Sequence, residues 1–294
     1  MSSKSRLRAY LQPRDFELLR GLFESRLMTL QHVTTLYFSG RQEAAKKRVQ
    51  DLKAAGMVNE RPRLQYHPSI LFLTRKGFET LGKNGKISDY PSLSQKSFEK
   101  RARVSELTQR HELDVMTVKA SLMAEVRTLS GFTIAEFSTW PVLFQFKGHY
   151  RDPEQSLAGE KEILVKPDGF LRLHEQTPKG EQFKHLFFLE VDRSSESHRT
   201  LGAKAQCYLD YYRRGGLAVR FGRPREEYQK FPFRVLMVFR NAERRNNAAE
   251  YFIQTTKART QILMTTFEEI KENPLKDIWI QPADYLAALK GTTY

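Results

Sequence analysis

The sequence has almost no cysteine, since Cys207 is the only one among 294 residues. A single cysteine cannot form an internal disulfide, so we expect Cys207 to be a small buried residue of a helix in a reducing compartment. The sequence also lacks an apolar run of the roughly twenty residues that cross a bilayer. Residues 1–12 lack the apolar core of a signal peptide. We therefore expect a cytoplasmic protein with no membrane partner.

Negative charge is scarce in the first third of the chain. Residues 1–103 contain 21 Lys and Arg against 9 Asp and Glu, a net charge of +12, whereas residues 104–294 contain 28 against 25, a net charge of +3. A basic domain beside a nearly neutral one predicts that contact with a polyanion is concentrated in the first. A basic surface without a partner is the alternative.

The first third shows the element order of a winged helix. Apolar residues recur at helical spacing in three segments, and Gly56 ends the third helix, which is predicted over residues 41–55. Two short strands are predicted at residues 57–63 and 69–74, and a further helix begins at Lys76. Three helices, a β-hairpin and a closing helix predict a winged helix-turn-helix domain.

The third helix carries the predicted contacts with DNA. In winged helices this helix enters the major groove, and the wing lies on the backbone or in the minor groove. Arg48 borders the buried stripe of the helix, so it can instead bond to the protein itself. A solvated basic face is the alternative for each remaining residue. The candidate DNA-binding residues are Arg41, Gln42, Lys46, Lys47, Gln50 and Lys53 on the helix, with Arg61 and Arg63 on the wing.

The sequence predicts two domains in an α+β protein. A winged-helix DNA-binding domain covers residues 1–82, and residues 83–103, with little apolar periodicity, read as a linker. Residues 104–294 form an α/β domain, and no internal repeat interrupts either part. Its predicted elements contain the order of helix, three strands, helix and strand that is typical of the PD-(D/E)XK nuclease core. The predicted elements are a helix at 104–127, strands at 132–137, 142–146, 162–173 and 185–192, a helix at 197–213, a strand at 234–239 and a helix at 245–257.

Acidic residues at two places in this domain predict a metal site. Glu190 and Asp192 are two apart on a predicted strand, so they share a face, and Asp168 follows a proline that can turn its carboxylate out of the ladder. Three converging carboxylates could hold Mg²⁺ or Mn²⁺, which would activate water for attack on phosphorus. The candidate metal ligands are Asp168, Glu190 and Asp192, and the candidate catalytic residues are these three with Lys204, which should lean towards the acidic pair.

One position departs from the nuclease pattern. Asp192 stands where that pattern has lysine, so the strand offers no cation to offset the charge that develops in the transition state. Lys204 or Lys166 could substitute. Alternatively, the acidic pair forms an ionic network with Lys204 and Arg193 in an inactive relic, and we favour this interpretation because a fold does not establish chemistry. Whether the protein is an enzyme stays open, with preference for the inactive form.

Six short motifs in both halves resemble those of the bacterial replication-relaxation family, and the similarity covers about residues 10–240. The resemblance implies a winged helix fused to a PD-(D/E)XK-like domain, in a DNA-binding protein of plasmids and other mobile elements. The last motif is also similar to the Gln-x-x-x-Tyr motif of exonuclease-type domains, with Lys in place of Gln. The motifs are RVQDLKAAGMV from Arg48, LTRKG from Leu73, HELDV from His111, PDG from Pro167, FLEVDR from Phe188 and KAQCY from Lys204.

Three functions remain open at this point. The first, which we favour, is a double-stranded DNA-binding accessory or regulator of replication, relaxation, transfer or transcription, whose nuclease-like domain serves in dimerisation or partner docking. The second is a Mg²⁺-dependent endonuclease or nickase targeted by its winged helix. The third is a scaffold for replication or conjugation proteins.

Overall fold

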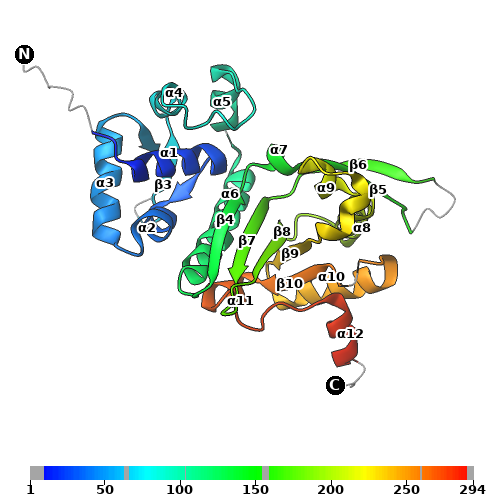
Figure 1. Cartoon of the computed structure of the whole chain (residues 1–294). Coiled ribbons are helices and arrows are strands. Elements are labelled where there is room, and N and C mark those ends of the chain that lie inside the picture. The colour runs from blue at the N-terminus through cyan, green and yellow to red at the C-terminus, as the bar shows by residue number, and fades with distance from the viewer. Residues whose placement is uncertain (1–9, 63–65, 103, 154–158, 259, 290–294) are drawn as a thin grey trace, which may run out of the picture. The chain divides into compact units, whose positions relative to one another are not determined.

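The computed structural model describes residues 10–62, 66–102, 104–153, 159–258 and 260–289 (Figure 1). The chain forms two compact units, residues 1–120 and 121–294, and the division falls inside helix α6 (Glu106–Val126). Helices and strands occur in both units, which confirms the predicted α+β class. No helix of the described residues is long and apolar enough to cross a membrane.

Unit 1 has three helices followed by an antiparallel hairpin and further helices. The central strand of its small sheet is β3, which pairs with both β1 and β2. The predicted contact Arg63 lies outside the described residues. The elements are α1 (Pro13–Ser25), β1 (Met28–Thr29), α2 (Leu30–Phe38), α3 (Gln42–Ala54), β2 (Val58–Glu60), β3 (Ile70–Leu73), α4 (Arg75–Lys83) and α5 (Gln95–Ala102).

Local sequence signals explain how the helices of unit 1 begin and end. The Thr29 hydroxyl accepts a hydrogen bond from the His32 N–H, and the Thr74 hydroxyl accepts one from the Gly77 N–H, so both threonines cap helices. Gly56 follows α3 with a φ of +71°, a left-handed conformation that glycine adopts without strain. These caps fix where α2, α3 and α4 begin or end.

The segment expected to be a linker packs on unit 1. It includes α5, and the rings of Tyr90 and Phe98 are buried. Phe98 stacks on Phe78 with ring centroids 4.5 Å apart. The many serines, glycines and lysines of this segment led to the prediction of a linker. The two buried aromatic side chains nevertheless pack it against unit 1.

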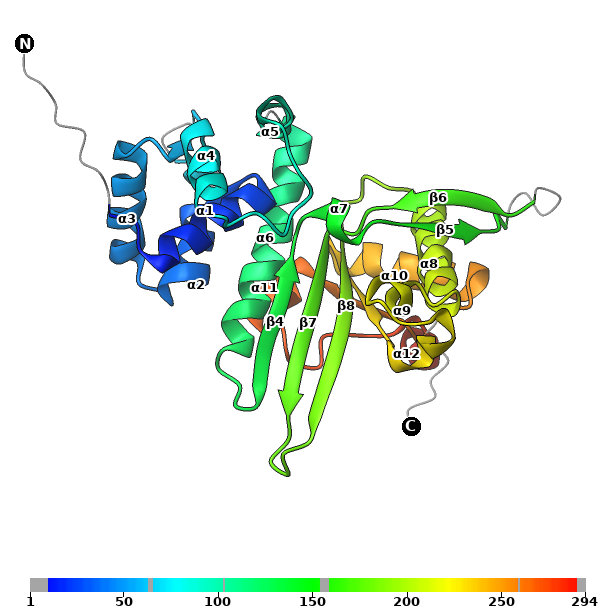
Figure 2. The same cartoon turned by 45° about the horizontal axis from the view of Figure 1, so that its top comes forward.

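Unit 2 is built on a five-stranded mixed sheet in the order β10-β9-β8-β7-β4. Strands β4, β7 and β8 are antiparallel neighbours (Figure 2), whereas β8, β9 and β10 are parallel. A separate two-stranded sheet pairs β5 with β6. The elements after α6 are β4 (Phe132–Ser138), α7 (Pro141–Phe144), β5 (Phe146–Tyr150), β6 (Lys161–Val165), β7 (Gly169–Gln176), β8 (Gln182–Asp192), α8 (His198–Arg213), α9 (Gly216–Arg220), η1 (Arg225–Lys230), β9 (Arg234–Phe239), α10 (Ala242–Thr255), β10 (Ile262–Thr266), α11 (Phe267–Glu272) and α12 (Pro282–Leu289).

The predictions of two strands in unit 2 were wrong. The strand expected at 142–146 is the short helix α7 followed by β5, because Pro141 favours the first turn of a helix. The strand expected at 162–173 is two strands in different sheets, β6 and β7. The break falls at Pro167, which has no N–H for a ladder, and it places Asp168 immediately before β7.

The core of unit 2 gathers aromatic rings between the sheet and the helices that cover it. Phe188 lies 5.2 Å from Tyr208 and 4.9 Å from Phe233, measured between ring centroids. Cys207 is fully buried in α8, as predicted, and burial raises the pKa of its thiol to about 12. Glu190 and Asp192 continue the face of β8 that carries Phe188, so the sheet delivers them to α8 and α10.

Candidate functional site

One face of α3 presents polar side chains to solvent. Ala45, Val49 and Leu52 are buried on the opposite face, as predicted. Four polar side chains on the exposed face have no hydrogen bond or ion pair with any of the described residues. These side chains are therefore available to a ligand. They are Gln42, Lys46, Lys47 and Gln50.

Arg48 is held inside unit 1 by a carboxylate, as the sequence suggested. Its Nε donates to Asp15 Oδ1 at 2.8 Å, and Asp15 is fully buried in α1. The hydrogen bond to Asp15 raises the pKa of Arg48. Arg48 therefore joins α3 to α1 and sets the orientation of the exposed face.

Three other predicted DNA-binding residues bind to groups of the protein itself. Lys53 Nζ lies 2.7 Å from Glu60 Oε2 of β2, which ties the end of α3 to the hairpin. Arg61 Nη1 donates to Gln109 Oε1 of α6 at 2.7 Å, and burial lowers the pKa of this arginine. Arg41 is exposed, although its Nε donates to the Phe38 carbonyl at 3.3 Å. The exposed face of α3 is therefore more available to a ligand than Lys53 and Arg61 beside the β2–β3 hairpin.

The structure brings Glu190 together with Lys204 and Tyr208 of α8. Glu190 Oε1 accepts from the Tyr208 hydroxyl at 2.6 Å, and Oε2 accepts from Lys204 Nζ at 3.1 Å. Lys204 also lies 2.9 Å from Glu196 Oε1. Asp168 Oδ2 accepts the Val191 N–H at 2.8 Å, which places its carboxylate beside β8. Lys204 thus leans towards Glu190, where the sequence predicted it.

Burial dominates the electrostatics of this cluster. Loss of solvent raises the pKa of Glu190 to about 7, and the charge of Asp168 adds to this, although Lys204 and Tyr208 oppose it. Burial alone would lower the pKa of Lys204, but Glu190 and Glu196 outweigh it and raise that pKa. The Glu190 carboxyl therefore takes up a proton much closer to neutral pH than an exposed glutamate.

Asp192 has a partner that sequence reasoning missed. Its Oδ2 accepts from Arg244 Nε of α10 at 2.7 Å, and its Oδ1 accepts the Ser194 N–H at 3.2 Å. Arg244 also donates to the Glu196 carbonyl. The expected partner was the adjacent Arg193, but Arg244 is 52 positions away, and no local signal in the sequence points to it.

The three acidic residues are not grouped as a three-ligand metal site in the described part of the chain. Among the described residues, no group of three or more His, Cys, Asp and Glu is placed to hold a metal ion. Mg²⁺ needs carboxylate oxygens that it can share with water and substrate. Here Lys204 and Tyr208 bind the two oxygens of Glu190, and Arg244 holds Asp192 through a different helix.

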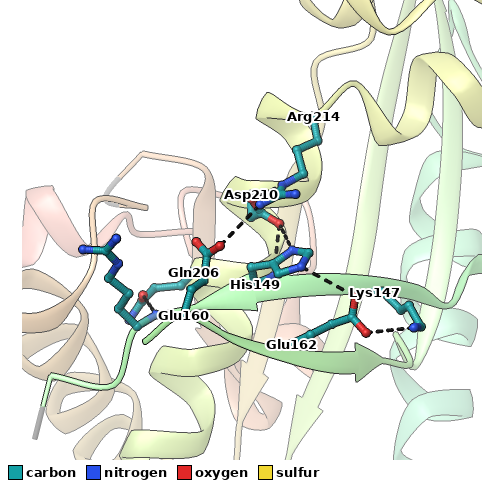
Figure 3. Close-up of polar contacts among 8 residues, drawn as sticks. Lys147, His149, Glu160, Glu162, Gln206, Asp210 and Arg214 are labelled. Atoms are coloured by element: carbon teal, nitrogen blue, oxygen red, sulfur yellow. Dashed lines mark hydrogen bonds and ion pairs between the residues drawn. The ribbon is translucent and has the colours of Figure 1, made fainter. Parts of the chain in front are cut away.

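A second polar cluster joins β5 to α8 (Figure 3). Asp210 Oδ2 accepts from both the backbone N–H and the ring Nδ1 of His149, at 3.0 and 2.9 Å, and its Oδ1 accepts from Arg214 at 2.6 Å. These bonds outweigh the effect of burial and lower the pKa of Asp210. The other ring nitrogen of His149 lies 3.5 Å from Glu162 Oε2 of β6.

The polar groups of this cluster bind to one another. Both ring nitrogens of His149 face carboxylates, so neither is left for proton transfer to a substrate. The Arg151 N–H likewise donates to Gln206 Oε1 at 3.0 Å. The outer edge of β5 is therefore bonded by side chains of α8, and the cluster holds the β5–β6 sheet on that helix.

Comparison with known proteins gave one match. Residues 19–221 match a family model described as replication-relaxation. The match begins in α1 and ends just after α9, so it includes the exposed face of α3 and the cluster of Asp168, Glu190 and Lys204. No curated protein and no solved structure gave a significant match.

Proposed function

Since the chain belongs to the replication-relaxation family, we propose that it binds double-stranded DNA as an accessory or regulator of replication, relaxation, transfer or transcription on plasmids and other mobile elements. The observation that carries this proposal is the exposed face of α3, where two lysines and two glutamines have no partner among the described residues. We place the protein in the cytoplasm, where its DNA lies.

We infer that unit 1 is a winged helix that places α3 in the major groove. The order α1, α2, α3, β2, β3 and α4 supports this, as does the excess of basic residues in the first third of the chain. Gln42 and Lys46 lie near the start of α3, where base edges come within reach. Lys47 and Gln50 follow on the same helix and would add contacts with phosphates and bases.

We infer that unit 2 is a PD-(D/E)XK-like domain that no longer cuts DNA. The order of β4, β7, β8, α8 and β9 supports the assignment. The ion pairs of the two carboxylates support inactivity. Asp192 is paired with Arg244 and Glu190 with Lys204, so both carboxylates are already bound by cations of the protein. Such a domain would serve in homodimerisation or in docking of replication or conjugation proteins.

A metal-dependent endonuclease or nickase is the second candidate. It is favoured by the proximity of Asp168, Glu190 and Lys204 at the end of β8. A nicking assay on supercoiled plasmid with Mg²⁺ or Mn²⁺ separates the two functions. We expect no cleavage. Cleavage that disappears in Glu190→Ala would establish the nuclease instead.

Salt dependence of duplex binding tests the proposed function. Each phosphate contact contributes a slope of about 0.9 to the fall of log affinity with log salt. We expect Lys46→Ala/Lys47→Ala to lower duplex affinity and to reduce this slope by as much as two such contacts, measured by fluorescence anisotropy. The matched control is Lys96→Ala/Lys100→Ala, which removes two exposed lysines from α5. Equal losses in both variants would show that α3 does not form the interface.

A further inference from the structure

The hairpin of β7 and β8 extends beyond the strands on either side of it (Figure 2). On one side, β4 begins at Phe132, which is opposite Glu175 of β7. On the other side, β9 begins at Arg234, which is opposite Phe187 of β8. Residues 182–186 of β8 therefore have no strand on that side among the described residues, and the hairpin ends as a two-stranded ribbon.

One face of this hairpin is polar. His174 of β7 is directly opposite Lys184 of β8 on one side and Thr133 of β4 on the other. Gln176 is opposite Gln182, and residues two apart on a strand point to the same face. These five side chains therefore form one continuous surface, which we call the ribbon face. Four of them are exposed and have no hydrogen-bond or ion-pair partner among the described residues, namely Thr133, Gln176, Gln182 and Lys184.

The ribbon face carries no carboxylate. Glu175 is adjacent to His174 in sequence, but successive residues of a strand point to opposite faces. On the opposite face Glu175 Oε2 lies 2.7 Å from the ring Nε2 of His185. Lys184 thus has no counter-ion on its own face in the described part of the chain. The ribbon face is also hollowed, with a volume of about 520 Å³. A ligand with negative charge and hydrogen-bonding groups matches this surface.

The most basic segment of unit 2 borders the ribbon face. Arg172 continues this face by one row towards the core, and its Cζ lies 4.9 Å from the ring centroid of Phe221, which follows α9. Residues 213–234, which include Phe221, contain 7 Lys and Arg against 2 Asp and Glu. The rest of residues 104–294 contains 21 against 23. The positive charge of unit 2 is therefore concentrated next to the ribbon face, where it would attract a polyanion.

The composition of the ribbon face favours DNA over a protein partner. Protein interfaces have an apolar core, and this face offers none. The major groove of a duplex admits a two-stranded β-ribbon, and its base edges present the donors and acceptors that glutamine binds. From this match we propose that the ribbon face enters the major groove, where Gln176 and Gln182 contact base edges and Lys184 binds a phosphate beside them.

This inference rests on the proposed function in taking duplex DNA as the ligand. It adds a second element that reads DNA, in unit 2, whereas the proposed function assigns the reading of bases to α3 in unit 1.

Charge reversal tests the ribbon face in the full chain. The probe is a fluorescein-labelled duplex of about 40 base pairs and mixed sequence, roughly 136 Å long at 3.4 Å per base pair. We expect Gln182→Glu/Lys184→Glu to weaken its binding about tenfold or more, measured by anisotropy, because the new carboxylates would face phosphates. The control is Lys271→Glu/Lys276→Glu, which makes a larger change of net charge at two exposed lysines outside the ribbon face and should have a much smaller effect. Equal effects would overturn the proposal.

Disulfide trapping identifies the groove. Cys207 is fully buried, so a cysteine introduced on the ribbon face is the accessible thiol. Gln182→Cys should be trapped by a duplex with a thiol tether on cytosine N4, which lies in the major groove, and not by a tether on guanine N2, which lies in the minor groove. The matched control Lys276→Cys should be trapped by neither. Trapping through guanine N2, or equal yields for the two cysteine variants, would contradict the proposal.

The two proposals fail separately. We expect Lys46→Ala/Lys47→Ala and Gln182→Glu/Lys184→Glu each to weaken duplex binding. A loss in the α3 variant alone, with the ribbon variant equal to its control, would overturn the ribbon proposal alone. A loss in the ribbon variant alone would overturn the assignment of DNA to α3. Absence of duplex binding by the wild type would overturn both.

Discussion

At the scale of single residues, the end of β8 is dominated by buried charge. Glu190 and Asp192 are both almost fully buried, and each has a cation from a different helix. A buried ion pair contributes little net stability, but removal of one partner leaves an uncompensated charge that costs about 3–5 kcal/mol. Lys204 and Arg244 are therefore required by the fold of unit 2 whether or not the site has chemistry.

Glu190 should make the stability of the protein depend on pH. Burial raises its pKa to about 7, above the value of about 4.3 in an unfolded chain, so the native state holds more protons in this window. The free energy of unfolding should therefore fall as pH rises from about 4.3 through 7. We expect Glu190→Gln to remove this component, so that its stability relative to wild type increases from pH 5 to pH 8 in urea titrations.

Glu181→Gln is the control for this effect, because Glu181 lies exposed in the turn between β7 and β8. Its stability difference from wild type is the reference with which the difference for Glu190→Gln is compared at each pH. A pH-independent difference for Glu190→Gln as well would show that Glu190 is ionised across the whole range and held by Lys204.

At the scale of elements, the contact between β5 and α8 depends on a glycine. A Cβ added at Gly148 would lie 2.5 Å from Cys207 Cβ, so only glycine lets this strand approach the helix so closely. The backbone N–H groups of His149 and Arg151 can then reach Asp210 and Gln206. The polar cluster of Figure 3 therefore depends on the close approach of β5 to α8.

Replacement of this glycine should loosen the β5–β6 sheet. We expect Gly148→Ala to lower the free energy of unfolding by about 1–3 kcal/mol, the usual cost of overpacking, as measured by urea denaturation. The control is Gly159→Ala, because no atom of the described residues lies within 4 Å of the added methyl group and its φ is ordinary. Equal stabilities for the two variants would mean that β5 can shift away from α8 without cost.

At the scale of the whole molecule, the chain consists of two units with different charge. The positive charge is concentrated in residues 1–103, but unit 1 continues to residue 120 because α6 completes it. Lys119 of α6 lies 3.3 Å from Glu24 of α1, and both are almost fully buried. His32 of α2 contacts Thr117 at 3.1 Å. A fragment that ends before α6 would lose these contacts.

Truncation tests the extent of the DNA-binding unit. We expect a fragment of residues 1–120 to fold cooperatively and to bind duplex with a salt dependence close to that of the full chain. A fragment of residues 1–103 should be much less stable, because it would lose the contacts that Lys119 and Thr117 of α6 make with Glu24 and His32. Circular dichroism with thermal melting measures both. Equal melting temperatures would show that the first half of α6 adds nothing to unit 1.

The sequence by itself determined the features that depend on neighbouring residues. Helical spacing of apolar residues located α1, α3 and α8, and Gly56 marked the end of α3. Short motifs along the chain identified the family, which the match over residues 19–221 confirmed. Alternation along β8 put Glu190 and Asp192 on one face, and helical spacing placed Lys204 beside them. Such patterns are local, so they can be read without knowledge of the fold.

Tertiary structure decided which distant groups meet. Only the fold pairs Asp192 with Arg244, Lys53 with Glu60 and Lys119 with Glu24, because these contacts join elements whose packing no local pattern specifies. It also separates β6 from β7 at Pro167. Ion pairs and sheet partners depend on long-range packing, where burial of apolar surface sets the geometry and charged groups must then find partners within it.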